Sequence, residues 1–256
     1  MKLTKNNYYS TEMANRYYTA SFCKEMLTCE AEAIAVLNGQ WKRPYSDALI
    51  IGSYVDAAFE SKKSFQNFKE THPEILKRDG TLKSDFVLAD AMIERAKSDP
   101  VFMRFMRGQH QKILVGEIGG YPFKAKLDVY APSRYITDLK TTRSFEPVYV
   151  AGQGRVSFAE AWHYPLQMAI YQKLDGNNLP CYIAAITKEN PPDIDLIEIP
   201  QETMDAEIEL LLDRLPRYDA IRHGLIEPER CGKCAYCRAT KRLTGPKSLL
   251  ELEFED

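Results

Sequence analysis

Two adjacent stretches with the alternation of β-strands constrain this chain more than any other feature. In residues 123–130, Phe, Ala, Leu and Val alternate with Lys, Asp and Tyr, and residues 136–142 follow after a turn-forming Ala-Pro-Ser-Arg segment. This pattern predicts a β-hairpin. Asp128 lies on the first strand, while Asp138 and Lys140 share one face of the second. An odd number of loop residues, such as 131–135, or a bulge would set Asp128 opposite Asp138.

These three side chains have the chemistry that hydrolysis of a phosphodiester requires. Mg²⁺ binds oxygen ligands, and it often takes only one or two carboxylates and keeps water at its other positions. A bound ion activates water and neutralises charge on the phosphate. Lys140 can orient or deprotonate that water, or stabilise the transition state. The alternative for any D-x-K tripeptide is a surface hairpin with solvated charges, but Asp128 on the neighbouring strand favours a metal site.

The same residues resemble the PD-(D/E)XK nuclease superfamily, with Asp128 as the first acid and Asp138-Leu139-Lys140 as the D-x-K motif. The resemblance implies an α/β (α+β) restriction-endonuclease-like core, in which a central mixed sheet is flanked by helices. It also implies that Asp128, Asp138 and the carbonyl of Leu139 bind Mg²⁺ or Mn²⁺. Within the superfamily, the chain is most similar to the branch of RecB, AddB, Cas4 and the phage RecE-like (exodeoxyribonuclease VIII-type) exonucleases.

Two further patterns match that branch. Gln167 and Tyr171 are spaced i, i+4 on a predicted helix, like the Q-x-x-x-Y motif that lines the DNA site of these nucleases. Asp56, on a predicted helix over residues 47–60, stands where RecB-branch enzymes carry a histidine ligand. A carboxylate there suits Mg²⁺ or Mn²⁺, whereas a helix-surface acid is the alternative. Glu117, upstream of the hairpin, is the second candidate for this extra carboxylate.

Polar and basic residues after the D-x-K strand are suited to phosphate contacts. We predict that DNA is bound by a hydroxyl-rich run, two arginines and a tyrosine: Thr141, Thr142, Arg143, Arg155 and Tyr164. The lysine-rich segment 61–83 is predicted to be an insertion loop. Its lysines can meet phosphates and its Phe65 and Phe68 can stack on bases, although a solvated surface is the simpler interpretation.

Three of the chain's six cysteines follow C-x-x-C-x-x-C spacing near residue 234, which indicates a site for a soft metal. The resemblance to AddB and Cas4 implies a [4Fe-4S] cluster held by four thiolates: Cys29, Cys231, Cys234 and Cys237. Cys23, or His223 if the metal is zinc, is the alternative fourth ligand. Spacing alone does not distinguish a cluster from Zn²⁺.

The composition fits one domain with a sizeable core, because 45% of the 256 residues are hydrophobic and 27% are charged. We expect a single nuclease domain over residues 1–256, with its C-terminal segment (about 224–245) clasped by the cysteines to a helix over residues 21–37. No apolar run reaches membrane-spanning length and no signal-like core opens the chain, so we expect a cytoplasmic protein without membrane contact. The net charge of −2 gives no overall basic field, which counts modestly against DNA binding.

The resemblance implies a Mg²⁺- or Mn²⁺-dependent deoxyribonuclease, an exonuclease that acts on duplex ends in the 5′→3′ direction. It places the enzyme in phage-type recombination by single-strand annealing, encoded by a phage or prophage in a bacterial host cell. A single-strand annealing recombinase (RecT/Beta-like) is then the implied partner, and homo-oligomers occur among functional relatives. The alternatives are a Cas4-like nuclease of CRISPR adaptation and a non-catalytic DNA-binding module. Intact Asp128, Asp138 and Lys140 favour an enzyme.

Overall fold

A five-stranded mixed sheet forms the centre of the computed structural model, which describes residues 3–44, 47–243 and 245–246. Its strands, in spatial order, are β1 (Gln109–Ile118), β2 (Tyr121–Ala131), β3 (Tyr135–Thr142), β6 (Cys181–Thr187) and β7 (Ile194–Ile199). Neighbours are antiparallel except for β3 and β6, which are parallel. Parallel neighbours need a long crossover, and the helices between β3 and β6 provide it. The mixed sheet with flanking helices confirms the predicted α/β fold.

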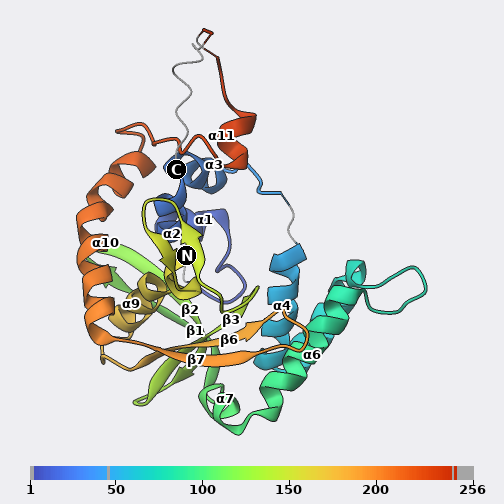
Figure 1. Ribbon diagram of the computed structural model, residues 1–256. Coiled ribbons are helices and arrows are strands. Elements are labelled where there is room, and N and C mark those ends of the chain that lie inside the picture. Colours follow the sequence, from blue (N-terminus) through green and yellow to red (C-terminus); the bar gives the residue numbers. More distant parts are fainter. Residues whose placement is uncertain (1–2, 45–46, 244, 247–256) are drawn as a thin grey trace.

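Helices cover both faces of the sheet (Figure 1). The first face carries α2 (Ala20–Thr28), α8 (Phe158–Ala161), α9 (Tyr164–Asp175) and α10 (Gln201–Arg222). The second face carries α4 (Asp47–Glu60), α6 (Ser84–Ser98) and α7 (Pro100–Phe105). Each face has its own apolar cluster, with Ile136 in the first and Leu139 in the second. The alternation of β3 therefore buries apolar side chains on both faces. Among the described residues, no helix has the length and apolar character needed to cross a membrane.

The segment predicted as an insertion loop, residues 61–83, instead begins with a helix, so this prediction was wrong. It contains α5 (Lys62–Thr71) and a short 3₁₀ helix, η1 (Pro73–Ile75). Ser61 caps α5 by accepting a hydrogen bond from the backbone N–H of Ser64. The rings of Phe65 and Phe68 pack against Tyr54 of α4, at centroid distances of 4.8 and 5.8 Å. Packing against α4 thus stabilises a helix that the lysine-rich composition of the segment does not predict.

The predicted helix over residues 21–37 is two helices, α2 and α3 (Glu30–Leu37), with Cys29 between them. Thr19 caps α2, and Cys29 takes an extended conformation with φ −165° and ψ 105°. The chain therefore turns at Cys29, whose side chain lies in the break and not on a helix face. The remaining elements are α1 (Thr11–Arg16), β4 (Val148–Val150), β5 (Gly154–Val156) and α11 (Ala235–Ala239).

The C-terminal segment docks against α3, as the side-by-side placement of α11 and α3 makes visible (Figure 1). Arg217 donates two hydrogen bonds of 2.7 Å to the carboxylate of Glu30. The backbone of Glu229 is bonded on both sides, since its N–H donates to Glu30 and its carbonyl accepts from Ala31. These contacts bring the late cysteines to the break between α2 and α3.

Candidate active site and thiolate centre

The sheet opens beside Asp128, where β2 and β3 separate. The two strands pair only at residues 129–131 of β2, and this register, extended by one residue, sets Asp128 opposite Asp138. The connecting loop holds three residues, 132–134, which is an odd number but shorter than the predicted 131–135. At the separation the backbone N–H of Leu139 donates to Asp128 Oδ2 at 3.0 Å. A side-chain carboxylate therefore takes the place of a carbonyl in the ladder and fixes Asp128 against β3.

An open cleft of about 880 Å³ lies over this separation. Six residues that the sequence singles out line it: Asp56, Asp128, Asp138, Lys140, Gln167 and Tyr171. The N-terminal segment and β2 add lysines, among them Lys24 and Lys126, while α4 and α5 add Glu60, Ser64 and Asn67. Carboxylates and ammonium groups therefore face one volume, as a site for a metal and a phosphate requires.

Asp138 is the most closely held of the acids, with 2% of its surface exposed. Its Oδ1 accepts a hydrogen bond of 2.7 Å from Gln167 Nε2. Its Oδ2 is buried 2.5 Å from Lys140 Nζ, but no described group donates a well-directed hydrogen bond to it. Gln167 Nε2 also donates to the hydroxyl of Tyr171 at 3.0 Å. A buried carboxylate oxygen with an ion pair and no directed donor retains capacity for a cation.

Burial and neighbouring charges raise the pKa of two of the acids, Asp128 and Asp56. Burial raises the pKa of Asp128 well above its usual range, and the charges of Asp138 and Asp56 add to the effect. Burial, together with Asp138, raises the pKa of Asp56 to about 7, against the opposing effect of Lys140. Burial lowers the pKa of Lys140, but the carboxylates of Asp138 and Asp128 outweigh it and the pKa is raised. A divalent cation would relieve this repulsion.

The oxygen donors therefore fit Mg²⁺ or Mn²⁺, the metals implied by the resemblance. Asp56, Asp128 and Asp138 offer hard ligands, and Asp138 Oδ2 is free of a directed donor. In the described part of the chain, only the four cysteines form a group of three or more His, Cys, Asp or Glu residues whose potential ligand atoms all lie within 4.8 Å of one another. The carboxylates would accordingly share an ion with water molecules, as Mg²⁺ sites usually do.

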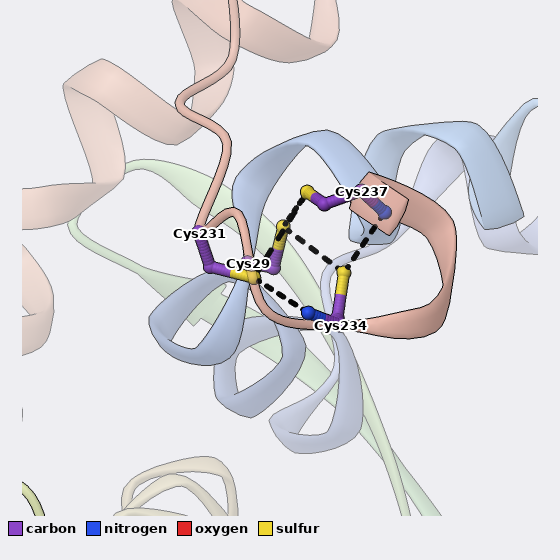
Figure 2. Close-up of side chains that lie close together, drawn as sticks. All are labelled: Cys29, Cys231, Cys234 and Cys237. Carbon is purple, nitrogen blue, oxygen red and sulfur yellow. Dashed lines mark hydrogen bonds between the residues drawn. The ribbon is translucent and has the colours of Figure 1, made fainter. Parts of the chain in front are cut away.

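Four sulfur atoms converge at a second place, where the break at Cys29 meets the C-terminal segment (Figure 2). The Sγ atom of Cys29 lies 3.6 Å from that of Cys237 and 3.8 Å from that of Cys234. Cys231 and Cys237 are separated by 3.9 Å between their sulfurs. Backbone N–H groups of Cys234 and Cys237 donate to the sulfurs of Cys231 and Cys234, both at 3.3 Å.

The thiolate, which is the metal-binding form of cysteine, is favoured at Cys231, whereas burial raises the pKa of Cys29 and Cys234. Burial raises the pKa of Cys231, but hydrogen bonds from the backbone of Cys234 and Lys233 outweigh burial and lower it to about 7. Cys23, an alternative fourth ligand, is fully buried in the first apolar cluster. His223, the other alternative, is exposed, and its Nδ1 lies 2.9 Å from the carbonyl of Asp219. The structure thus brings Cys29, and neither alternative, to the late cysteines.

The sequence and the fold are also similar to those of known proteins. The model of the family described as "PDDEXK-like domain of unknown function (DUF3799)" matches residues 19–240. The chain belongs to this PDDEXK-like family. A crystal structure from Eubacterium rectale, named "Putative exonuclease", has 36% sequence identity and a TM-score of 0.92, with 98% of each chain covered. The structure of SSO0001 has 15% identity and a TM-score of 0.31 over 77% of this chain and 87% of that one, too low to support an argument. No curated protein matches the sequence.

The two candidates for the extra metal-binding carboxylate, Asp56 and Glu117, lie at different places in this PDDEXK-like fold. Asp56 of α4 lines the cleft. Glu117 is exposed and pairs with Pro122 near the turn that joins β1 to β2, at the far end of that hairpin from Asp128. The geometry supports Asp56, because Glu117 does not line the cleft.

None of the five residues predicted to bind DNA is among the residues that line the cleft. Tyr164 contacts two residues that do, since its ring centroid lies 5.1 Å from both Lys24 Nζ and Lys140 Nζ. Thr142 is buried and its hydroxyl donates to the carbonyl of Ser144. Thr141 is half-buried, while Arg143 and Arg155 are exposed, the latter on the β4–β5 hairpin. Apart from Tyr164, these residues make none of the contacts described above for the cleft, and their role in DNA binding stays a prediction.

Lys24 is the residue of the site that sequence reasoning missed. Its Nζ donates to Gln167 Oε1 at 2.7 Å, across 143 residues of sequence. Burial and the charge of Lys140 lower the pKa of Lys24 to about 8. No motif marks this lysine, because its function depends on a partner far along the chain. The only available signal was its position on the same predicted helix as Cys29.

Proposed function

We propose that this protein is a metal-dependent deoxyribonuclease that removes nucleotides from DNA ends. The observation that carries the proposal is the meeting of Asp128, Asp138 and Lys140 in one cleft, with Asp138 bonded to Gln167. The relative from Eubacterium rectale, whose name includes "exonuclease", supports the same class of activity. A family likeness alone would support the fold, whereas these side chains supply the chemistry.

The chain's own residues hold and polarise the reacting groups. Asp56, Asp128 and Asp138, with the carbonyl of Leu139, would hold Mg²⁺ or Mn²⁺. When bound, such an ion supplies an activated water and neutralises charge on the phosphate. Lys140, held by its ion pair with Asp138, directs an ammonium group at the same volume and stabilises negative charge as it develops. Gln167 fixes the orientation of Asp138 through a hydrogen bond to Oδ1.

For the thiolate centre we propose a structural role that joins residues 224–245 to the N-terminal helices and makes the chain one domain. Four thiolates at about 2.3 Å from one tetrahedral ion lie about 3.8 Å apart, close to the 3.6–3.9 Å that separates three of the six pairs of sulfurs here, while all six pairs lie within 4.8 Å. A cubane cluster places each thiolate on a different iron, so its sulfurs stand farther apart. This arrangement supports one Zn²⁺, in contrast to the [4Fe-4S] cluster that the resemblance implies.

The resemblance to RecE-like exonucleases supports a proposal for the biological role. We propose that the protein degrades duplex ends in the 5′→3′ direction during recombination by single-strand annealing, with an annealing recombinase as its partner. Digestion of duplexes labelled at either the 5′ or the 3′ end tests the direction. Release of label from the 3′ end first would contradict it.

Asp138→Ala and Lys140→Ala test the nuclease itself. Each should reduce cleavage of end-labelled duplexes, with Mg²⁺ or Mn²⁺ present, by about 10³-fold or more. DNA binding should be largely retained, because other groups contact the phosphates. Glu117→Ala, an exposed carboxylate outside the cleft, is the matched control and should cleave normally. Undiminished cleavage by either active-site variant would remove the basis of the proposal.

A further inference from the structure

An exposed tyrosine lines the cleft beside the proposed active site. Tyr9 has 75% of its surface exposed, and its ring nonetheless lies among the residues that enclose the cleft. Tyrosine is usually at least partly buried. A large aromatic face left open to a cleft that also contains lysines is suited to stacking on a flat, negatively charged ligand.

The position of Tyr9 is fixed by its neighbours. Lys126 Nζ lies 4.5 Å from the centroid of the Tyr9 ring. The ring of Tyr8 contacts Tyr9 edge to face, with 4.9 Å between centroids. Tyr8 is itself buried, and Lys124 Nζ donates to its backbone carbonyl at 2.5 Å. Because these contacts hold Tyr9 before any ligand binds, stacking on it costs little conformational entropy.

A second aromatic pair lines the same cleft from α5 and the residue after it. The rings of Phe68 and His72 are stacked, with 4.1 Å between centroids and 25° between planes. Ser64 and Asn67 of the same helix add polar groups. Aromatic faces thus reach the cleft from the N-terminal segment and from α5, while the acids and Lys140 belong to β2, β3 and α4.

The size of the cleft is compatible with one strand of nucleic acid. Its volume of about 880 Å³ falls in the range of sites that enclose one ligand of a few hundred daltons. A volume of this size holds a few nucleotides of a single strand. The aromatic faces of Tyr9 and Phe68 in the cleft are suited to stacking on bases that are not paired.

From these observations we propose that the cleft binds one unpaired strand of nucleic acid, with Tyr9 stacking on a base and Lys126 meeting the backbone. This inference rests on the proposed nuclease function and names its substrate as the unpaired end of a strand. Tyr9 then acts in substrate binding, and the energy of stacking offsets part of the cost of separating the terminal base pair.

Binding of fluorescein-labelled oligonucleotides tests the proposal, with Ca²⁺ in place of Mg²⁺ to prevent cleavage. Tyr9→Ala should weaken binding of a single strand by about tenfold, whereas Tyr9→Phe should retain it because the ring remains. Tyr149→Ala is the matched control, since Tyr149 is 65% exposed but does not line the cleft. A 2-aminopurine at the strand terminus should lose fluorescence on binding to the wild type, and less so with Tyr9→Ala.

Two results would overturn the inference: equal affinity of Tyr9→Ala and the wild type for the single strand, or equal binding of a duplex whose ends are both closed by hairpins. A wild-type protein that cleaves no DNA with Mg²⁺ or Mn²⁺ would instead overturn the proposed function. Normal cleavage combined with binding that does not depend on Tyr9 would overturn this inference and leave the proposed nuclease function standing.

Discussion

The side-chain amide of Gln167 joins Asp138 to Lys24, since its Nε2 donates to Asp138 Oδ1 and its Oε1 accepts from Lys24 Nζ, both at 2.7 Å. The orientation of the amide is thereby fixed at both ends. Loss of the amide would leave a buried carboxylate oxygen and an ammonium group without their partners. Gln167 therefore determines the geometry of Asp138 without supplying a ligand itself.

Gln167→Leu should lower the cleavage rate by about 10–100-fold, the range typical of residues that orient metal ligands. The measurement is single-turnover cleavage across a range of Mg²⁺ concentrations, because a misoriented Asp138 should also raise the Mg²⁺ requirement. Gln172→Leu is the control, since Gln172 is a buried glutamine of the same helix that donates to Leu179 and Gln201 instead. An equal loss in both variants would mean that Gln167 matters only for folding.

Asp56→Ala should raise the concentration of Mg²⁺ needed for half-maximal cleavage by about tenfold or more, because a hard ligand is lost. Asp56→His should retain activity better with Mn²⁺ than with Mg²⁺, since imidazole suits Mn²⁺ better. Glu117→Ala is the comparison. A crystal soaked in Mn²⁺ with the ion on Glu117 and distant from Asp56 would reverse the assignment.

Lys124 gives a prediction for pH. It is 2% exposed, and burial together with Arg222 lowers its pKa to about 8, against about 10.4 in the unfolded chain. Between these values the unfolded state binds more protons, so the stability contributed by this residue rises with pH. Relative to Lys124→Met, the wild type should gain about 2–3 kcal/mol in free energy of unfolding from pH 7.5 to 10.5. Urea unfolding at several pH values measures the difference, and a constant difference would contradict the prediction.

The thiolate centre predicts one zinc per chain and no iron in protein purified without oxygen. Cys234→Ser should lose the metal and lower the melting temperature more than it lowers the cleavage rate of the folded protein, because none of the four cysteines lines the cleft and the centre ties two segments together. Cys181→Ala, a buried cysteine outside the centre, should keep the metal. Four irons per chain, with a brown colour from absorption near about 400 nm, would favour the cluster instead.

Local patterns in the sequence predict the hairpin, the strand faces and the two motifs of the cleft. Asp128 and Asp138 could be set opposite one another from the alternation and the odd loop alone, because a period of two leaves few registers. Gln167 and Tyr171 could be assigned to one helix face for a similar reason. These predictions depend on residues close together in the chain.

The features that the sequence did not predict depend on distant partners. α5 lies in a lysine-rich segment, and its packing against Tyr54 stabilises it as a helix. The break at Cys29 interrupts a continuous apolar pattern, and contacts of Glu30 with Arg217 and Glu229 accompany it. Lys24 reaches Gln167 only after α2 packs against α9. Neither the helix propensity of these residues nor the spacing of the motifs predicts such long-range contacts.

The separation of Cys29 from Cys237 has a consequence for synthesis. The two residues are 208 positions apart, so the ribosome makes the first ligand long before the other three emerge. Until residue 237 is available, the turn between α2 and α3 lacks the neighbours that hold it. A chain released early would carry every acid of the cleft and yet leave its first helices unsecured, exposed to proteases. Closure of the centre can therefore come only after the last of its four cysteines has been made.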